Sequence, residues 1–235
     1  MKIVIVGGSG GIGLAIVKQA LQYYPEAYII ATWRTRQPDF THQRLRWHPL
    51  DAANEKAVAE MAEQLGSVTI LINAIGLLHT PDHRPEKTIR EFDPVFFQEN
   101  MAANTLPSIL LAKYFMKSLR SDNPSWFISL SARVGSISDN HLGGWLSYRA
   151  SKAALNMAVK TIAIEWKVKL PNCCVLLFHP GTTDSALSQP FHRNLPEGQL
   201  HSPNYTAETL METIKESRPE DSGRFVSFDG NDVDW

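Results

Sequence analysis

Short apolar runs alternate along the chain with longer stretches in which apolar residues recur every three or four positions. Residues 3–6 are four apolar residues in succession, as in a strand of a sheet that is covered on both faces, and residues 11–22 have helical spacing. This pattern predicts strands at residues 3–6, 27–32, 44–50, 68–72, 126–130, 173–178 and 224–228. It predicts helices at residues 11–22, 54–65, 94–119, 148–169 and 207–217. Strands separated by helices indicate an α/β fold, a doubly wound parallel sheet of about seven strands with helices on both faces.

Two stretches of the pattern carry more detail. Pro107 lies inside the predicted helix 94–119 and cannot donate to the carbonyl of Ala103, so we expect a kink beside Asn104. Residues 182–205 form the longest irregular stretch, and we expect a lid or disordered segment that decides the substrate. Because no linker rich in Pro, Gly and Ser divides the chain, we expect one domain over residues 1–235.

The composition narrows the classes of function. The chain is 43% apolar and 20% charged with a net charge of -1, and it has no concentrated basic stretch. This argues against a nucleic-acid or membrane-surface role. The adjacent Cys173 and Cys174 lie in an apolar run and no apolar stretch reaches membrane-spanning length, so we expect a cytoplasmic protein. The eight histidines are scattered without ligand spacing, so we expect no metal site.

A glycine-rich turn, Gly7-Gly8-Ser9-Gly10-Gly11-Ile12-Gly13, joins the first predicted strand to the first predicted helix. Glycines let backbone amides approach a pyrophosphate, and the start of a helix adds partial positive charge there. Close packing of strand and helix could also require such a turn. Its position after the first strand favours a dinucleotide site.

The end of the second predicted strand bears on which dinucleotide is bound. An NAD site usually offers a carboxylate there for the ribose diol, but this chain has Thr32-Trp33-Arg34-Thr35-Arg36 and no acid before Asp39. A guanidinium can pair with a 2′-phosphate, so Arg34 favours NADP, with NAD as second choice. A solvated pair of arginines on a surface loop is the alternative.

Tyr148 and Lys152 lie four residues apart at the start of a predicted helix and therefore share one face. A nearby ammonium favours the phenolate, so we expect the pKa of Tyr148 to fall from about 10. Such a phenol can pass a proton to a carbonyl oxygen as hydride arrives, or remove it in the reverse direction. Trp145 and Leu146, just before the pair, are candidates for an apolar pocket wall.

In combination, these features resemble the short-chain dehydrogenase/reductase family over nearly the whole chain. The resemblance rests on the glycine turn, Asp51, Asn73-Ala74-Ile75-Gly76, Asn104, Tyr148-x-x-x-Lys152 and Pro180-Gly181 in family order. Within the family, residues 131–137, 148–156 and 228–235 resemble the C-factor and sniffer-type carbonyl reductase branch.

The resemblance implies a Rossmann-type enzyme that transfers hydride between NADP(H) and a small or medium carbonyl or alcohol. Tyr148 would be the acid/base, Lys152 would tune it and hold the nicotinamide ribose, and Asn104 would hold a water linked to Lys152. Asp51 would contact the adenine amine, while Asn73, Ala74 and Gly76 would pack along the adenosine ribose. Pro180, Gly181, Thr182 and Thr183 would close over the nicotinamide carboxamide. A homodimer or homotetramer, associating through residues 94–119 and 148–169, is also implied.

Three departures from the family pattern matter. Val6 replaces a frequent threonine before Gly7, so one stabilising hydroxyl is missing, and Ala74-Ile75 replaces the usual Asn-Ala. The position of the family's carbonyl-orienting serine, three residues before Gly135, holds Ala132. A local bulge could aim the neighbouring Ser131 inward instead, and we expect that role for Ser131. Without such a donor, a dinucleotide-binding signalling or regulatory protein with weak or no turnover is the alternative function.

Overall fold

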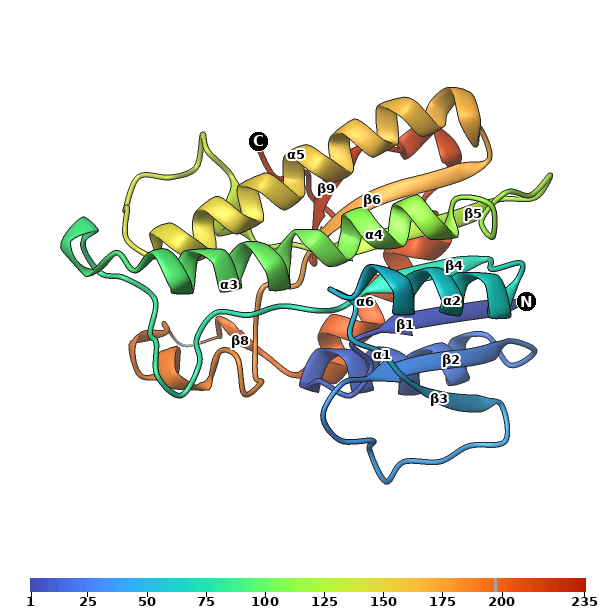
Figure 1. Ribbon diagram of the computed structural model, residues 1–235, viewed down its shortest axis with the longest axis horizontal. Helices are drawn as coiled ribbons and strands as arrows, with labels where there is room; N and C mark the ends of the chain where they lie inside the picture. Colours follow the sequence, from blue (N-terminus) through green and yellow to red (C-terminus); the bar gives the residue numbers. More distant parts are fainter. Residues whose placement is uncertain (197) are drawn as a thin grey trace.

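The computed structural model describes residues 1–196 and 198–235, so Glu197 of the predicted loop 182–205 lies outside the described residues. A parallel seven-stranded sheet has the order β3-β2-β1-β4-β5-β6-β9 (Figure 1). Its strands are β1 (Lys2–Val6), β2 (Tyr28–Trp33), β3 (Leu45–Pro49), β4 (Ile70–Asn73), β5 (Ser125–Leu130), β6 (Cys173–His179) and β9 (Arg224–Ser227). The predicted α/β fold with a doubly wound parallel sheet is therefore confirmed.

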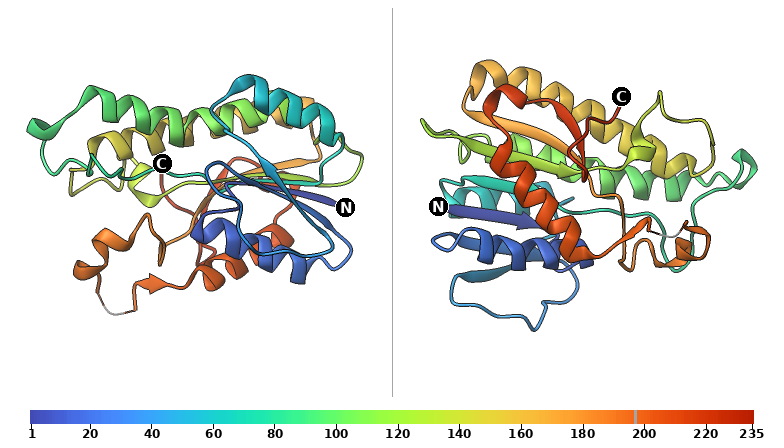
Figure 2. Two further views of the ribbon diagram at one scale, coloured as in Figure 1. Left: turned by 60° about the horizontal axis from the view of Figure 1, so that its bottom comes forward. Right: turned by 180° about the vertical axis from the view of Figure 1, so that it is seen from behind.

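Helices cover both faces of the sheet, as Figure 2 shows. One face carries α2 (Glu55–Leu65), α3 (Pro94–Asn104), α4 (Leu106–Phe115) and α5 (Leu146–Lys169). The other face carries α1 (Gly11–Tyr23) and α6 (Pro203–Glu216). In β1, Val4 and Val6 point into the first layer, and Ile3 and Ile5 into the second. The continuous apolar run thus follows from burial on both sides.

The predicted helix 94–119 is broken, as expected from Pro107. The helix α3 ends at Asn104 and α4 begins at Leu106, with Thr105 between them. Pro107 is buried in the first turn of α4, where its missing N–H costs no hydrogen bond within the helix. The break sets the end of α3 beside α5, where Thr105 Oγ1 donates to the Ser151 carbonyl at 2.8 Å.

The expectation of an irregular segment at residues 182–205 was only partly right. The short strands β7 (Thr182–Thr183) and β8 (Leu200–His201) pair in parallel, and a 3-10 helix spans Gln189–Asn194. The helix α6 already begins at Pro203, because the Ser202 side chain caps it by accepting from Tyr205 N at 3.1 Å. The segment therefore folds against the carboxyl ends of the strands.

No helix within the described residues is long and apolar enough to cross a membrane.

Candidate active site

Three adjacent pockets line the carboxyl ends of the strands. The outer pocket, of about 440 Å³, is lined by residues that include Gly7, Ser9, Trp33, Arg34, Asp51 and Gly76. The central pocket, of about 370 Å³, is lined by residues that include Gly10, Gly11, Ile12, Gly13, Ala74, Gly76, Ser131, Lys152 and Pro180. The tyrosine pocket, of about 550 Å³, is lined by residues that include Ala132, Trp145, Tyr148, Pro180, Gly181, Thr182, Thr183, Phe191 and Phe228. Neighbouring pockets share lining residues, so the three follow one another along the sheet edge.

The glycine turn is built tightly enough to exclude side chains at two positions. Gly7 has a φ of +81°, and a Cβ on Gly13 would lie 2.1 Å from the Gly7 carbonyl oxygen. The helix α1 starts at this turn without a side-chain cap and without an acidic residue in its first turn. The first-turn N–H groups and their partial positive charge therefore border the central pocket.

The hydroxyl expected to be missing from the turn comes from another strand. Thr32, at the end of β2, is 1% exposed, and its Oγ1 accepts the Gly7 N–H at 2.9 Å. Thr32 therefore replaces the hydroxyl that Val6 cannot supply. The parallel pairing of β1 with β2 sets Ile5 opposite Ala31, so Thr32 lies beside the start of the turn that follows β1.

Arg34 and Arg36 have different surroundings. Arg34 is exposed and lines the outer pocket. The Arg36 guanidinium lies 3.6 Å from the Asp39 carboxylate on the exposed loop, outside the pocket lining. Trp33 also lines the outer pocket, and its buried Nε1 has no hydrogen-bond partner among the described residues.

Two predicted asparagines serve the scaffold in this structure. Asn73 is 2% exposed and donates to Ser108 Oγ at 2.7 Å, and it lines none of the three pockets, unlike its neighbours Ala74 and Gly76. Asn104 holds the loop after β4 by accepting from Leu77 N at 2.7 Å and donating to Leu77 O at 2.8 Å. It also donates to Ser151 Oγ on α5 at 2.9 Å.

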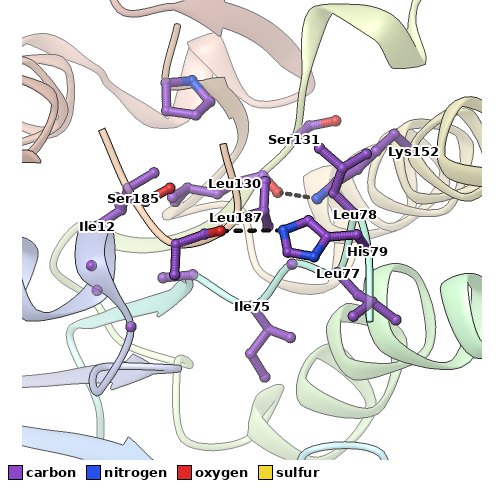
Figure 3. Close-up of a pocket in the computed structure, with 17 residues that line it drawn as sticks. Ile12, Ile75, Leu77, Leu78, His79, Leu130, Ser131, Lys152, Ser185 and Leu187 are labelled. Carbon is purple, nitrogen blue, oxygen red and sulfur yellow. Dashed lines mark hydrogen bonds between the residues drawn. The ribbon is translucent and has the colours of Figure 1, made fainter. Parts of the chain in front are cut away.

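Tyr148 and Lys152 are both buried on one face of α5. The Lys152 Nζ lies 5.8 Å from the centroid of the Tyr148 ring and donates to the Leu130 carbonyl oxygen at 3.1 Å (Figure 3). Burial lowers the pKa of Lys152 to about 8. Burial also raises the pKa of Tyr148 above 10, so the expected fall in that pKa was wrong. Desolvation of the phenol outweighs an ammonium group that is directed at a carbonyl oxygen.

The strand end before Tyr148 places Ser131 and Ala132 differently. Ser131 lines the central pocket, and its hydroxyl donates to Asn156 Oδ1 on α5 at 2.6 Å. Ala132 lines the tyrosine pocket together with Tyr148. Ser131 lines the pocket of Lys152 and Ala132 lines the pocket of Tyr148, so the orienting role expected for Ser131 stays a prediction.

Aromatic side chains from distant segments form the walls of the tyrosine pocket. Trp145 packs on Phe191 with 4.9 Å between ring centroids, and His201 packs on Phe228 at 4.3 Å. Burial, with Arg133 nearby, lowers the pKa of His179 to about 4, so this imidazole is neutral at pH 7. Trp145 lines the pocket as expected, but Leu146 does not.

Sequence reasoning missed Phe191 and Phe228 of the tyrosine pocket, and it also missed His79 and Leu187 of the central pocket. None of these residues has a spacing that signals a site. Leu187 and Phe191 reach it because the segment after β7 folds back over the strand ends, whereas His79 follows β4 and Phe228 follows β9. The loop after β4 meets this segment where His79 Nε2 lies 3.2 Å from the Ala186 carbonyl oxygen.

Among the described residues, no group of three or more His, Cys, Asp or Glu side chains could hold a metal ion.

The fold and the glycine turn define a Rossmann-type α/β protein. The family model described as short chain dehydrogenase matches residues 1–195, and the chain belongs to this family of enzymes. The predicted resemblance is therefore confirmed.

Two curated relatives illustrate the branch of the family. A benzil reductase ((S)-benzoin forming) of Bacillus subtilis (strain 168) is 27% identical over 235 residues, covering 90% of this chain and 92% of the relative. The C-signal protein of Myxococcus xanthus is 26% identical over 170 residues, covering 72% of this chain and 94% of the relative.

Solved structures are similar over the full length of the chain. An NADPH-bound carbonyl reductase from chicken fatty liver has a TM-score of 0.87 at 22% identity, covering 100% of this chain and 94% of that one. The carbonyl reductase Sniffer of D. melanogaster has a TM-score of 0.85 at 22% identity, covering 100% of this chain and 99% of that one. At this identity the likeness shows the fold.

Proposed function

We propose that this chain is an NADP(H)-dependent oxidoreductase that transfers hydride between the nicotinamide and a small or medium carbonyl or alcohol. The observation that carries the proposal is the pairing of buried Tyr148 and Lys152 beside the glycine turn. Tyr148 lines a pocket with room for a substrate, and Lys152 lines the neighbouring pocket over the start of α1. A proton donor and a dinucleotide cradle are thereby adjacent.

The residues of the outer and central pockets fit NADP. The start of α1 offers uncapped N–H groups for a pyrophosphate, and Gly13 allows the turn to pack closely against α1, because a Cβ at this position would collide with the Gly7 carbonyl oxygen. Arg34 supplies a positive charge at the outer pocket, and no carboxylate follows β2 before Asp39. The chicken carbonyl reductase, described as NADPH-bound, and a Burkholderia multivorans protein described with bound NADP support this choice. NAD is the second choice.

In the reductive direction, a bound NADPH would supply the hydride, and the residues that would hold it line the outer and central pockets. Tyr148 then gives its hydroxyl proton to the carbonyl oxygen, so the product is an alcohol and the phenol must be reprotonated. The phenol of Tyr148 is protonated at neutral pH, so it has a proton to donate. Lys152 holds its ammonium group one helical turn away and stabilises the negative charge that develops on the phenol oxygen as the proton leaves. Asn104 would hold a water beside Lys152, as the family resemblance implies.

The tyrosine pocket favours an uncharged substrate with an apolar body. Its walls include Trp145, Phe191 and Phe228. Arg133, the basic group at the rim, is paired with Asp139 at 3.0 Å, and His179 is neutral. The benzil reductase relative is named for a carbonyl compound.

The test incubates the protein and NADPH with each member of a panel of aliphatic and aromatic ketones and aldehydes. NADPH consumption is measured by its absorbance. Wild type should consume NADPH with at least one carbonyl, and Tyr148→Phe should lower kcat by about 10²-fold or more. NADPH affinity of the variant, measured by fluorescence titration, should stay unchanged. Tight NADPH binding without consumption on any member of the panel would reject the enzyme proposal.

A second candidate function is supported by Ala132, which lines the tyrosine pocket where a hydroxyl donor would orient the substrate oxygen. In this case the chain is a dinucleotide-binding signalling or regulatory protein whose turnover is incidental, in keeping with its similarity to C-signal. Ala132→Ser discriminates the two candidates. A rise in kcat of about 10-fold or more would mark the native chain as catalytically weak and favour this second function, whereas an unchanged kcat would favour the enzyme.

We further propose a homodimer or homotetramer in the cytoplasm. Apolar side chains of α4 and α5 are exposed, with Ile109 at 40% and Ile164 at 60%. Cys173 and Cys174 are buried free thiols, which suits a reducing compartment. Light scattering of the purified chain would test the assembly, and a monomer at all concentrations would reject it.

A further inference from the structure

The segment that leads into α5 has an unusual backbone. Gly143, Gly144 and Trp145 have φ values of +65°, +68° and +52°, three left-handed residues in succession. Trp145 is the one residue other than glycine with a positive φ among those described. Such a conformation persists only where surrounding contacts determine it. The contacts at Trp145 therefore decide where α5 begins, and with it where Tyr148 lies.

Glu86 supplies these contacts from the loop between β4 and α3. Its backbone carbonyl oxygen accepts the Trp145 N–H at 2.5 Å. Its carboxylate accepts the Ser147 N–H at 3.2 and 3.3 Å and also the Ser147 hydroxyl. The side chain of Glu86 is 2% exposed, and this one residue thus holds positions 145 and 147, on either side of the first helical residue.

The helix α5 has no cap of its own. Trp145 at its N-cap makes no side-chain hydrogen bond, and the first turn contains no acidic residue. A buried carboxylate is costly unless hydrogen bonds compensate it, and here the N–H and hydroxyl of Ser147 do so. A negative charge at a helix start is also favourable. Glu86 therefore acts as a cap supplied from a different element.

We propose that Glu86 is a positioning residue for the hydride-transfer reaction. It fixes the first turn of α5, so that the Tyr148 phenol and the Trp145 wall of the tyrosine pocket keep their places. The inference rests on the proposed function of Tyr148. Glu86 contacts residues 145 and 147 and acts on Tyr148 through the backbone of residues 145–147.

The experiment compares Glu86→Ala and Glu86→Gln with wild type in kcat, KM for the carbonyl and NADPH affinity by fluorescence titration. Glu86→Ala should lower kcat by about 10-fold or more, because small misplacements of a reacting group are costly, while NADPH affinity changes less than about twofold. Glu86→Gln keeps an acceptor oxygen at the same reach and should recover part of the loss.

Asp93→Ala is the matched control. Asp93 lies on the same loop and its carboxylate also accepts backbone N–H groups at a helix start, those of Val95 at 2.7 Å and Phe96 at 3.0 Å, but this helix is α3 and the contacts hold neither Trp145 nor Ser147. It should leave kcat unchanged. The inference is overturned if Glu86→Ala keeps kcat within about twofold of wild type, or if NADPH affinity falls in parallel with kcat.

Amide hydrogen exchange separates this inference from the proposed function. Glu86→Ala should speed exchange in residues 146–150 by about fivefold or more, as expected for a lost cap, and Asp93→Ala should not. If wild type shows no turnover, the proposed function fails, and the exchange result still decides the role of Glu86. If Glu86→Ala does not fold, Glu86→Gln and Ser147→Ala are compared with wild type instead. The inference is overturned if both variants have the kcat and the exchange rates of wild type.

Discussion

Replacing Lys152 with methionine should stabilise the fold at neutral pH while abolishing its catalytic contribution. Lys152 is 3% exposed, and burial lowers its pKa from 10.5 in the unfolded chain to about 8. Because the folded state holds the proton less tightly, keeping this ammonium charged costs about 3 kcal/mol at pH 7. Methionine has a similar shape and no charge. It gives up the hydrogen bond to the Leu130 carbonyl, worth about 1 kcal/mol, so a net gain of about 2 kcal/mol is expected at pH 7.

The pH dependence provides the sharper test of this reasoning. A lowered folded-state pKa means that wild-type stability rises with pH between about 8 and 10.5 as the buried lysine loses its proton. The advantage of Lys152→Met should therefore shrink by about 2 kcal/mol between pH 7 and pH 9.5. Measurements should stay below pH 10, because the raised pKa of Tyr148 lowers wild-type stability above that value.

Urea denaturation at both pH values measures the difference. Lys160→Met is the control on the same helix, since Lys160 also donates to a carbonyl oxygen, that of Gly223 at 2.8 Å, but keeps contact with solvent. Lys160→Met thus reports the loss of a lysine–carbonyl hydrogen bond on this helix without the full burial of Lys152. The reasoning is refuted if Lys152→Met is less stable than wild type at pH 7, or if its advantage is the same at both pH values.

Two further predictions concern the dinucleotide cradle. Arg34→Ala should weaken NADPH binding, measured by fluorescence titration, by about 10-fold or more and leave NADH binding unchanged. Arg36→Ala is the control and should change the binding of neither cofactor. Equal losses of NADPH and NADH binding in Arg34→Ala would contradict a 2′-phosphate contact. Thr32→Val preserves the shape of the side chain but leaves the Gly7 N–H without its acceptor. It should lower the free energy of unfolding, measured by urea denaturation, by about 1–3 kcal/mol. It should also weaken the binding of NADPH and NADH to the same extent. Full wild-type stability would show that the bond to Thr32 is dispensable.

The layers of the fold could be predicted from the sequence because each signal is local. Four apolar residues in β1 alternate between two cores, so the run itself reports burial on both faces. The break at Pro107 follows from one missing N–H. The tyrosine and lysine of α5 share a face through helical geometry alone.

Contacts between distant segments could not be predicted in this way. The hydroxyl of Thr32 serves a turn 25 residues earlier in the chain, and that match depends on strand pairing. Phe191 reaches Trp145 only through the folding of the segment after β7. The pKa of Tyr148 was misjudged for a related reason, because desolvation depends on everything packed around the phenol, whereas spacing reveals a single neighbour.

The end of β5 shows how a one-residue difference decides chemistry. Ser131 and Ala132 are consecutive, and extended backbone sends their side chains to opposite sides. Ser131 faces α5, where Asn156 Oδ1 accepts a hydrogen bond from its hydroxyl, and Asn156 Nδ2 in turn donates to the Gly135 carbonyl oxygen at 3.2 Å. Moving the Ser131 hydroxyl into the tyrosine pocket would break this buried chain of hydrogen bonds and shift the strand register. The sequence leaves both outcomes open, and the hydrogen bonds of Asn156 explain why the serine stays on the α5 side.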